Sequence, residues 1–187
     1  MKTKELAMGR KGKTRPCRKP KCKLCKMICD HDEVMVNKYK VRSGGGSCNT
    51  YNVVYLFICT LCNQPYTGRT VCRMNIRTNQ HRSAFYKVLK FANNCKGVNL
   101  SKNPKFSNDA DDLYALGMYL VSEHGCTNRS DFDKIYKVMI LENASPRTID
   151  IRENIWIHKL KSLRPLGINR ANPFSLPLLS LNDFSVK

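Results

Sequence analysis

Side chains able to hydrolyse a phosphodiester bond recur along this sequence in a suggestive order. Such hydrolysis needs an activated water, a group that takes up its proton, and positive charge beside the pentavalent phosphate. Phenol, imidazole, guanidinium and carboxylate groups can meet these needs. We treat six residues as candidates for an active site: Tyr55, Tyr66, Arg77, His81, Glu153 and Asn169.

The two tyrosines are expected on a β-hairpin. Residues 52–61 form a run rich in β-branched and aromatic residues, Asn63-Gln64-Pro65 is typical of a turn, and residues 65–68 restart an extended segment. A helical period then extends from about residue 71 to 92. Arg77 and His81 are four residues apart within that period. Their side chains are therefore expected on the same face of the helix.

A later helix is predicted from Ser145-Pro146, acting as N-cap and first helical residue, to about Leu163. Its apolar residues recur at helical spacing and form one stripe, and Glu153 lies in the middle of that stripe. An unpaired carboxylate buried there would cost several kcal/mol, so Glu153 is expected to meet a metal ion or a cation. A purely structural ion pair between Glu153 and an arginine is the alternative.

Together these residues resemble the GIY-YIG nuclease family, and within it the endonuclease domain of Penelope-like retroelements. The resemblance covers roughly residues 48–170, and Asn169 matches the late asparagine of the family. The first motif has Val53-Val54 in place of Gly-Ile, and Thr67 replaces Ile in the second, but neither change removes a reactive group. The resemblance rests on VVY (53–55), YTG (66–68), the interval from Gly68 to Arg77 and His81, and RENIWIHKLKSLRPLGIN (152–169).

This resemblance implies a role for each remaining candidate. Tyr55 would act as a general base or position the water, and Tyr66 would hold the nucleophile or a phosphate oxygen. Arg77 would carry transition-state charge, and His81 would orient a phenol or transfer a proton. Glu153 would bind one Mg or Mn ion. The implied activity is a metal-dependent DNA endonuclease that nicks target DNA, so that the new end primes reverse transcription.

The same resemblance implies DNA as the substrate and a nuclear location. Retroelement RNA and a reverse transcriptase domain encoded elsewhere would be further partners. Two alternatives stay open. One is a zinc-dependent DNA-binding module whose catalysis has decayed, and the other is a homing, repair or restriction nuclease of the same superfamily.

Cysteine usage predicts structural zinc. Ten cysteines in 187 residues, without an apolar signal-peptide run, are typical of intracellular thiols, for which metal binding is the simplest explanation. The first zinc site is expected to consist of Cys17, Cys22, Cys25 and Cys29. His31 or Cys48 could replace one of these four ligands. The alternative to a zinc site is a set of free thiols in a basic arm.

A second pair of cysteines, Cys59 and Cys62, lies between the two tyrosine motifs. This placement resembles the paired cysteines of Penelope-like nucleases, and His124 is the expected third zinc ligand. The fourth is open among His81, His158 and Cys126. Two buried thiols that pack against the sheet are the alternative to a second zinc site.

A large positive charge predicts a polyanionic partner. Lys and Arg number 33 against 14 Asp and Glu, which gives a net charge of +19, and residues 1–26 hold eleven basic side chains but only one acidic residue. This basic segment is expected to be disordered until it lies along a phosphate backbone. A membrane is the less favoured partner because no amphipathic or lipidation signal accompanies the charge. The expected DNA contacts are Arg10, Lys11, Lys13, Arg15, Arg18, Lys19, Lys21, Lys23 and Arg69.

The predicted organisation is a basic, cysteine-rich arm over residues 1–44, a nuclease-like domain over residues 45–170 and a tail over residues 171–187. Gly44-Gly45-Gly46 is expected as a hinge or turn. The predicted fold class is α+β, with a small antiparallel three-stranded sheet flanked by helices in the order β-β-α-α-β-α. The second helix of that order is expected from about residue 109 to 125, and the third strand within residues 133–142.

Overall fold

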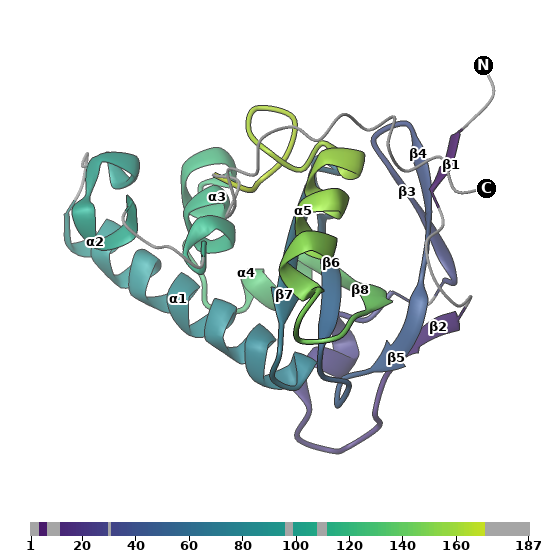
Figure 1. Ribbon diagram of the computed structural model, residues 1–187. Coiled ribbons are helices and arrows are strands. Elements are labelled where there is room, and N and C mark those ends of the chain that lie inside the picture. Colours follow the sequence, from purple (N-terminus) through teal and green to yellow (C-terminus); the bar gives the residue numbers. More distant parts are fainter. Residues whose placement is uncertain (1–3, 7–11, 30, 96–98, 108–111, 171–187) are drawn as a thin grey trace.

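The computed structural model describes residues 4–6, 12–29, 31–95, 99–107 and 112–170 (Figure 1). It is an α+β fold built on a three-stranded antiparallel sheet, as the sequence predicts, and the strands of that sheet lie in the order β7-β6-β8. Every residue of the central strand is buried, because helices cover both faces of the sheet and residues of the N-terminal segment contribute to the core on each side. The three strands are β6 (Val53–Cys59), β7 (Pro65–Thr70) and β8 (Tyr136–Asn143).

The hairpin of β6 and β7 forms where the sequence places it. Asn63 adopts a left-handed φ of 60° in the turn, a conformation that asparagine tolerates. The third strand starts later than predicted, because residues 131–135 form a short helix, α4 (Asp131–Ile135). An irregularity in the β6–β8 pairing lies between Val54 and Tyr55.

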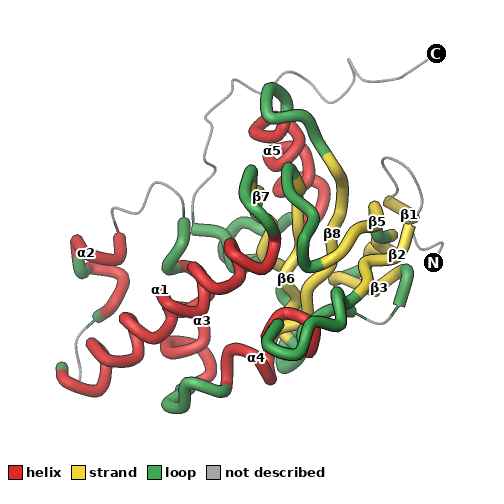
Figure 2. The backbone as a smooth tube through the Cα atoms, turned by 90° about the horizontal axis from the view of Figure 1, so that it is seen from below, coloured by secondary structure: helices red, strands yellow, loops and turns green. Residues whose placement is uncertain are grey.

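The long helix α1 (Met74–Asn94) begins three residues later than its sequence period suggests. Its first backbone amides are used elsewhere, since those of Met74 and Asn75 donate to Thr50 and Cys48. Figure 2 shows α1 and α3 (Ala115–His124) side by side. The helix α3 ends before Gly125, as predicted, but it starts at Ala115. The predicted start near residue 109 lies outside the described residues. The short η2 (Leu100–Lys102) and α2 (Pro104–Ser107) lie between α1 and α3 in the chain.

The last helix, α5 (Ile149–Leu160), is shorter than predicted at both ends. Ser145 is not its N-cap, because its carbonyl closes a turn by accepting the amides of Thr148 and Ile149. The helix stops where Lys161 adopts a left-handed φ of 53°. It packs on β7 and β6 (Figure 1). None of the helices in the described ranges is long and apolar enough to cross a membrane.

The chain after α5 returns to the outer edge of β7. The amide of Ile168 donates to the carbonyl of Pro65 at 2.9 Å, and Asn169 bonds to the next stretch of the same strand. An open sheet edge exposes unpaired backbone groups, and this return satisfies them. The predicted tail, residues 171–187, lies outside the described residues.

The N-terminal segment is folded, so the expectation of a disordered arm is wrong for residues 12–29. Leu24, Met27 and Ile28 are buried in the core, and Ile28 forms a backbone bridge to Val138 of β8. Burial of these apolar side chains stabilises the folded segment, although basic residues surround them in the sequence. Residues 1–3 and 7–11, with Arg10 and Lys11, lie outside the described residues.

Strands of this segment form two further small sheets, ordered β1-β4-β3 and β2-β5. Residues 44–46 belong to a strand and are neither hinge nor turn. A Cβ atom at Gly44 would lie 2.4 Å from the carbonyl oxygen of Leu141, which shows how closely β5 approaches β8. The division of domains at residue 44 stays a prediction. The elements are β1 (Lys4–Leu6), β2 (Gly12–Arg15), η1 (Lys23–Lys26), β3 (Glu33–Val36), β4 (Tyr39–Arg42) and β5 (Gly44–Ser47).

We expect Gly44→Ala to lower the free energy of unfolding by about 3 kcal/mol, because the new methyl group collides with backbone that cannot move aside cheaply. The matched control is Gly125→Ala, where φ is +59° and no atom lies within 4 Å of the added carbon. Only local strain of about 1 kcal/mol is expected there. Urea denaturation measures both, and equal losses would contradict the close approach of β5 to β8.

Candidate active site and metal centres

The hydroxyl of Tyr55 lies at the centre of a buried polar cluster. His81 Nε2 is 2.8 Å from Tyr55 Oη, and Arg77 Nε donates to the same oxygen at 3.2 Å. Tyr55 comes from β6, whereas Arg77 and His81 come from one face of α1, as their spacing predicts. The ring of Tyr66 stands edge-on to His81 at 5.5 Å. Four of the six candidates are therefore brought together.

The partners of His81 determine where its proton lies. His81 Nδ1 is 3.1 Å from the backbone carbonyl oxygen of Leu113, which can only accept a hydrogen bond. We assign the proton to Nδ1, which leaves the lone pair of Nε2 to accept the hydroxyl proton of Tyr55. Burial, assisted by the nearby Arg77, lowers the pKa of His81 to about 3. The imidazole is therefore neutral at physiological pH, and the lone pair of Nε2 serves as a hydrogen-bond acceptor.

Both phenols are protonated in this environment. Burial raises the pKa of Tyr55 to about 12, and Arg77 opposes the rise. Burial also raises the pKa of Tyr66 well above its ordinary value, and its hydroxyl donates to the carbonyl of Asp112 at 3.3 Å. The hydroxyl of Tyr55 thus donates to His81 and accepts from Arg77.

Gly68 makes room for the tyrosine opposite it. Tyr55 and Gly68 are cross-strand partners, and a Cβ atom at position 68 would lie 2.6 Å from Tyr55 Oη. The phenol lies across the bare backbone of β7, so any side chain at this position would push the hydroxyl away from His81. The glycine of the second motif is therefore required by the position of the phenol.

Glu153 meets a cation, as its place in the apolar stripe predicts. Its Oε2 is 3.2 Å from Nε of Arg69, and Asp150 also pairs with that guanidinium. Burial raises the pKa of Glu153 to about 7, although Arg69 and Arg77 both lower it. The ion pair with an arginine, which was the alternative to a metal ion, is thus present. Arg69 was expected to contact DNA, but here it is a counter-ion.

Asp150 is a feature that sequence reasoning missed. It precedes Glu153 by three residues on α5, so the two carboxylates lie on the same face of the helix. That spacing was the available signal. Two carboxylates that face one cation are a set of hard oxygen ligands, which suits Mg or Mn once the guanidinium moves aside.

Asn169 has a positioning function in this structure. Its Oδ1 accepts from the amide of Thr67 at 2.9 Å, and its Nδ2 donates to the carbonyl of Thr67 at 2.8 Å. Both polar groups of the side chain are engaged by one residue of β7. Asn169 therefore holds the returning chain against the strand that carries Tyr66 and Gly68.

The first cysteine cluster differs from the expected set by one ligand. The sulfur atoms of Cys17, Cys22, Cys25 and Cys48 all lie within 4.8 Å of one another. Cys29 is not in the cluster, because it lies beyond η1 and packs in the core on the other side of the sheet, with its backbone amide bonded to Val138. Cys48, named beforehand as a possible replacement, completes the set from the loop after β5.

The spacing within this cluster suits a tetrahedral zinc ion. Cys25 Sγ is 3.6 Å from Cys17 Sγ and 3.7 Å from Cys48 Sγ. Four sulfurs at about 2.3 Å from a central ion are separated from each other by about 3.8 Å. A disulfide would require about 2.05 Å, and all four cysteines are free. A backbone hydrogen bond from Lys19 lowers the pKa of Cys17 to about 7, which favours its thiolate form, whereas burial raises the pKa of Cys22 and Cys48.

The second cluster contains the three residues expected for it. His124 Nε2 is 3.3 Å from Cys59 Sγ and 3.6 Å from Cys62 Sγ. A tetrahedral zinc ion would place sulfur and nitrogen ligands about 3.5 Å apart. Within the described part of the chain, no fourth metal-binding residue joins the three.

None of the three expected fourth ligands lies in this group: His81, His158 and Cys126. His81 is engaged by Tyr55 and Leu113. The hydroxyl of Tyr119 approaches Cys62 Sγ to 3.0 Å, on the side of the cluster formed by α3. The assignment of His81 to zinc, which would have removed it from catalysis, is therefore not supported by its contacts.

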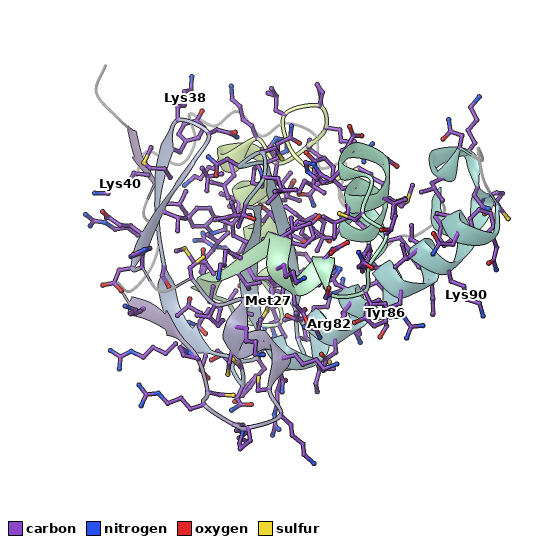
Figure 3. All side chains as sticks on the ribbon, turned by 180° about the vertical axis from the view of Figure 1, so that it is seen from behind. Met27, Lys38, Lys40, Arg82, Tyr86 and Lys90 are labelled. Atoms are coloured by element: carbon purple, nitrogen blue, oxygen red, sulfur yellow. The ribbon has the colours of Figure 1, made fainter. Side chains whose placement is uncertain are left out.

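The basic residues expected to contact DNA are exposed wherever the structure describes them, apart from Arg69. Lys13 lies 3.9 Å from Asp32 across the surface. Many basic side chains extend outward from the N-terminal segment and from α1 (Figure 3). The exposed set in the N-terminal segment is Lys13, Arg15, Arg18, Lys19, Lys21 and Lys23.

The neutral state of His81 predicts a pH dependence of stability. In the unfolded chain a histidine takes up a proton near pH 6.5, whereas the folded pKa is about 3, so acidification between these values favours the unfolded state. We expect the free energy of unfolding to fall by about 1.4 kcal/mol per pH unit more in the wild type than in His81→Gln. Denaturation at several pH values between 4 and 6 measures this, and parallel curves would refute it.

The cysteine geometry predicts a difference between two neighbouring substitutions. Cys48→Ser should lower the zinc content of the purified protein by about one equivalent, because it removes one ligand of a four-thiolate site. Cys29→Ser should leave the zinc content unchanged, since Cys29 packs outside the cluster. Elemental analysis of the dialysed proteins measures both. Loss of zinc from the Cys29 variant alone would restore the ligand set expected from sequence.

No protein-family model matches this chain, and no curated protein and no solved structure matches it.

Proposed function

We propose that this protein is a metal-dependent DNA endonuclease that nicks target DNA. The observation that carries the proposal is the hydroxyl of Tyr55, which donates to the neutral imidazole of His81 and accepts from the guanidinium of Arg77. Here the phenol has a base on one side and a fixed positive charge on the other, as proton removal from a nucleophile requires.

The proposed reaction uses this proton path. A water oxygen adds to phosphorus while its proton passes to Tyr55 Oη, and the hydroxyl proton of Tyr55 moves to His81 Nε2. The pKa of His81 would have to rise for this transfer, which the negative charge of the bound phosphate favours. The bond between phosphorus and the 3′ oxygen breaks, and that oxygen takes a proton from solvent. Arg77 stabilises the negative charge on the phosphate, since a guanidinium stays protonated and can bind two oxygens. The products are a 5′ phosphate and a 3′ hydroxyl.

Glu153 is the proposed ligand of the catalytic ion, with Asp150 beside it. Carboxylate oxygens fit Mg or Mn, whose coordination is completed by water and phosphate. The bound ion would supply positive charge to the scissile phosphate and its leaving oxygen. Arg69 pairs with both carboxylates and would have to swing toward Asp150 when the ion binds Glu153.

The resemblance to Penelope-like endonucleases supports a specific use for the nick. The new 3′ hydroxyl would prime reverse transcription of retroelement RNA by a polymerase domain encoded elsewhere. DNA in the nucleus is then the substrate, and the two cysteine clusters would hold structural zinc ions. A homing, repair or restriction nuclease of the same superfamily would share the chemistry, but the cysteine segment and residues 156–169 favour the retroelement assignment.

One observation favours a second candidate, a zinc-dependent DNA-binding module without catalysis. Tyr55, Tyr66 and His81 are almost fully buried, and the pKa values of both phenols lie far above neutrality. Such a cluster also serves as a rigid core between β6 and α1. The two candidates agree on DNA binding and on zinc, and they differ in whether the bound DNA is cut.

Cleavage of supercoiled plasmid separates the two candidates. With Mg or Mn, we expect the wild type to convert the plasmid to open circles, and Glu153→Ala to slow this conversion by about a hundredfold or more. Tyr55→Phe keeps the ring but removes the proton path, and a loss of about a hundredfold or more is expected. Glu123→Gln removes an exposed carboxylate from α3 and should nick as the wild type does.

The outcomes are distinct. Metal-dependent nicking that both substitutions abolish, with the Glu123 variant active, would support the endonuclease. Equal DNA binding by all four proteins without nicking by any would support the binding module. Nicking that survives in purified Tyr55→Phe and Glu153→Ala would indicate a contaminating nuclease and would overturn the proposed active site.

A further inference from the structure

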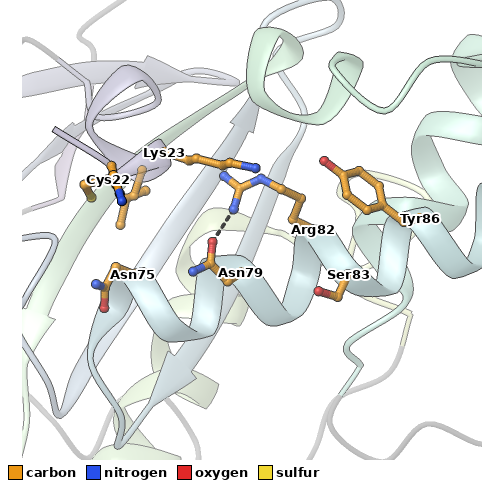
Figure 4. Close-up of a pocket in the computed structure, with 9 residues that line it drawn as sticks. Cys22, Lys23, Asn75, Asn79, Arg82, Ser83 and Tyr86 are labelled. Atoms are coloured by element: carbon orange, nitrogen blue, oxygen red, sulfur yellow. Dashed lines mark hydrogen bonds between the residues drawn. The ribbon is translucent and has the colours of Figure 1, made fainter.

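A polar cavity of about 340 Å³ lies between the first cysteine cluster and α1 (Figure 4). We call it the basic cavity. It is on the opposite side of α1 from Arg77 and His81, so it is separate from the candidate active site. The residues around it are Lys21, Cys22, Lys23, Leu24, Asn75, Asn79, Arg82, Ser83 and Tyr86.

The charge of the basic cavity is positive. Lys21 and Lys23 are exposed at its rim, and no acidic side chain is among the described residues that line it. Arg82 forms the floor, where it is held by Asp133 through Nε at 2.8 Å and by Asn79. Because Asp133 neutralises Arg82, the two lysines provide the net attraction for an anion. A phosphate is the anion that such a pair of lysines binds in a nucleic acid.

A second observation concerns the aromatic ring that lines the cavity. Tyr86 lies about one turn beyond Arg82 on the same side of α1 (Figure 4), with the guanidinium of Arg129 at 5.1 Å from its centroid. A nucleic-acid base can stack on an aromatic ring, whereas a free phosphate cannot. The cavity therefore offers a contact to a base as well as to a phosphate.

A surface path joins the basic cavity to the active site. A second hollow along α1 shares Asn79 and Ser83 with the basic cavity. It also includes Gln80, which accepts from Arg77 Nη1 at 3.2 Å, and Leu113, whose carbonyl binds His81. The path follows about half the circumference of a helix that is about 10–12 Å wide. A single strand can follow so tight a curve, whereas a stiff duplex cannot.

We propose that the basic cavity binds one nucleotide of a single-stranded nucleic-acid segment that leads away from the active site across α1. The phosphate lies at Lys21 and Lys23, and the base lies against the ring of Tyr86. A volume of about 340 Å³ is at the small end of the range for ligand sites and suits one nucleotide. The statement that the strand leads away from the active site rests on the proposed function. Binding of a nucleotide in the basic cavity does not depend on cleavage.

Binding of a dye-labelled single-stranded oligonucleotide tests this inference, measured by fluorescence anisotropy without added Mg or Mn and at several salt concentrations. The same sequence as a blunt duplex is the second arm. Lys21→Ala combined with Lys23→Ala should weaken single-strand binding about tenfold and reduce the salt slope by about 1.4, at about 0.7 per lost contact. The control combines Lys38→Ala with Lys161→Ala, two exposed lysines that do not line the cavity (Figure 3 labels Lys38).

Tyr86 provides a test that does not touch the cysteine segment. Tyr86→Ala should weaken single-strand binding about tenfold and duplex binding less than twofold, because only an unstacked base can contact the ring. Tyr86→Phe keeps the ring and should bind both as the wild type does. Equal effects of Tyr86→Ala on the two nucleic acids, or no effect on either, would overturn the inference. Zinc content and melting temperature confirm that each variant is folded.

These results can be told apart from a failure of the proposed function. A wild type that nicks DNA, with cavity variants that bind single strands normally, would refute the cavity and retain the endonuclease. A wild type that does not nick, with cavity variants that lose single-strand binding, would retain the cavity and refute the catalysis. Absence of nucleic-acid binding by the wild type would refute both.

Discussion

The buried hydroxyl of Tyr55 is the constraint to which the rest of the candidate site conforms. A hydroxyl removed from water without partners costs about 1–3 kcal/mol, so its donor and acceptor functions must both be met inside the protein. His81 meets the first and Arg77 the second. Both come from α1, which sets how that helix lies against the sheet. Position 68 must be a glycine for the same reason, because the phenol of Tyr55 occupies the space that a side chain there would need.

The N-terminal segment depends on the first cysteine cluster in a similar way. Its three early cysteines lie within nine residues of chain, and Cys48 joins them from the loop after β5. A metal ion held by these four thiolates would tie residues 17–25 to the loop after β5, where the carbonyl of Cys48 accepts the backbone amide of Asn75 at the start of α1. The basic cavity lies at this junction. The cluster thus places lysines of the N-terminal segment opposite polar side chains of α1.

Local sequence patterns predicted the elements well wherever backbone preference and burial agreed. The continuous apolar run of β6, the turn at Asn63 and the glycine after α3 were sufficient signals. Predictions were wrong where contacts between residues far apart in the sequence determine the local structure. The start of α1 depends on carbonyls of Thr50 and Cys48, and residues 12–29 fold because β8 offers an apolar surface for Met27 and Ile28. The local sequence predicts a hinge at Gly44, but the structure requires glycine there because β8 approaches the backbone closely.

By itself the sequence determined the sheet, its helices and the set of reactive side chains, because these follow from periodicity and residue type over short intervals. Only the tertiary structure decided their partners. In the folded protein Arg69 pairs with Glu153 and Asp150. Asn169 forms hydrogen bonds with the backbone of Thr67. Cys48, and not Cys29, lies with the three early cysteines. The physical reason is that ion pairs, metal ligands and buried hydrogen bonds act over a few ångströms in space, whatever separation along the chain lies between their members.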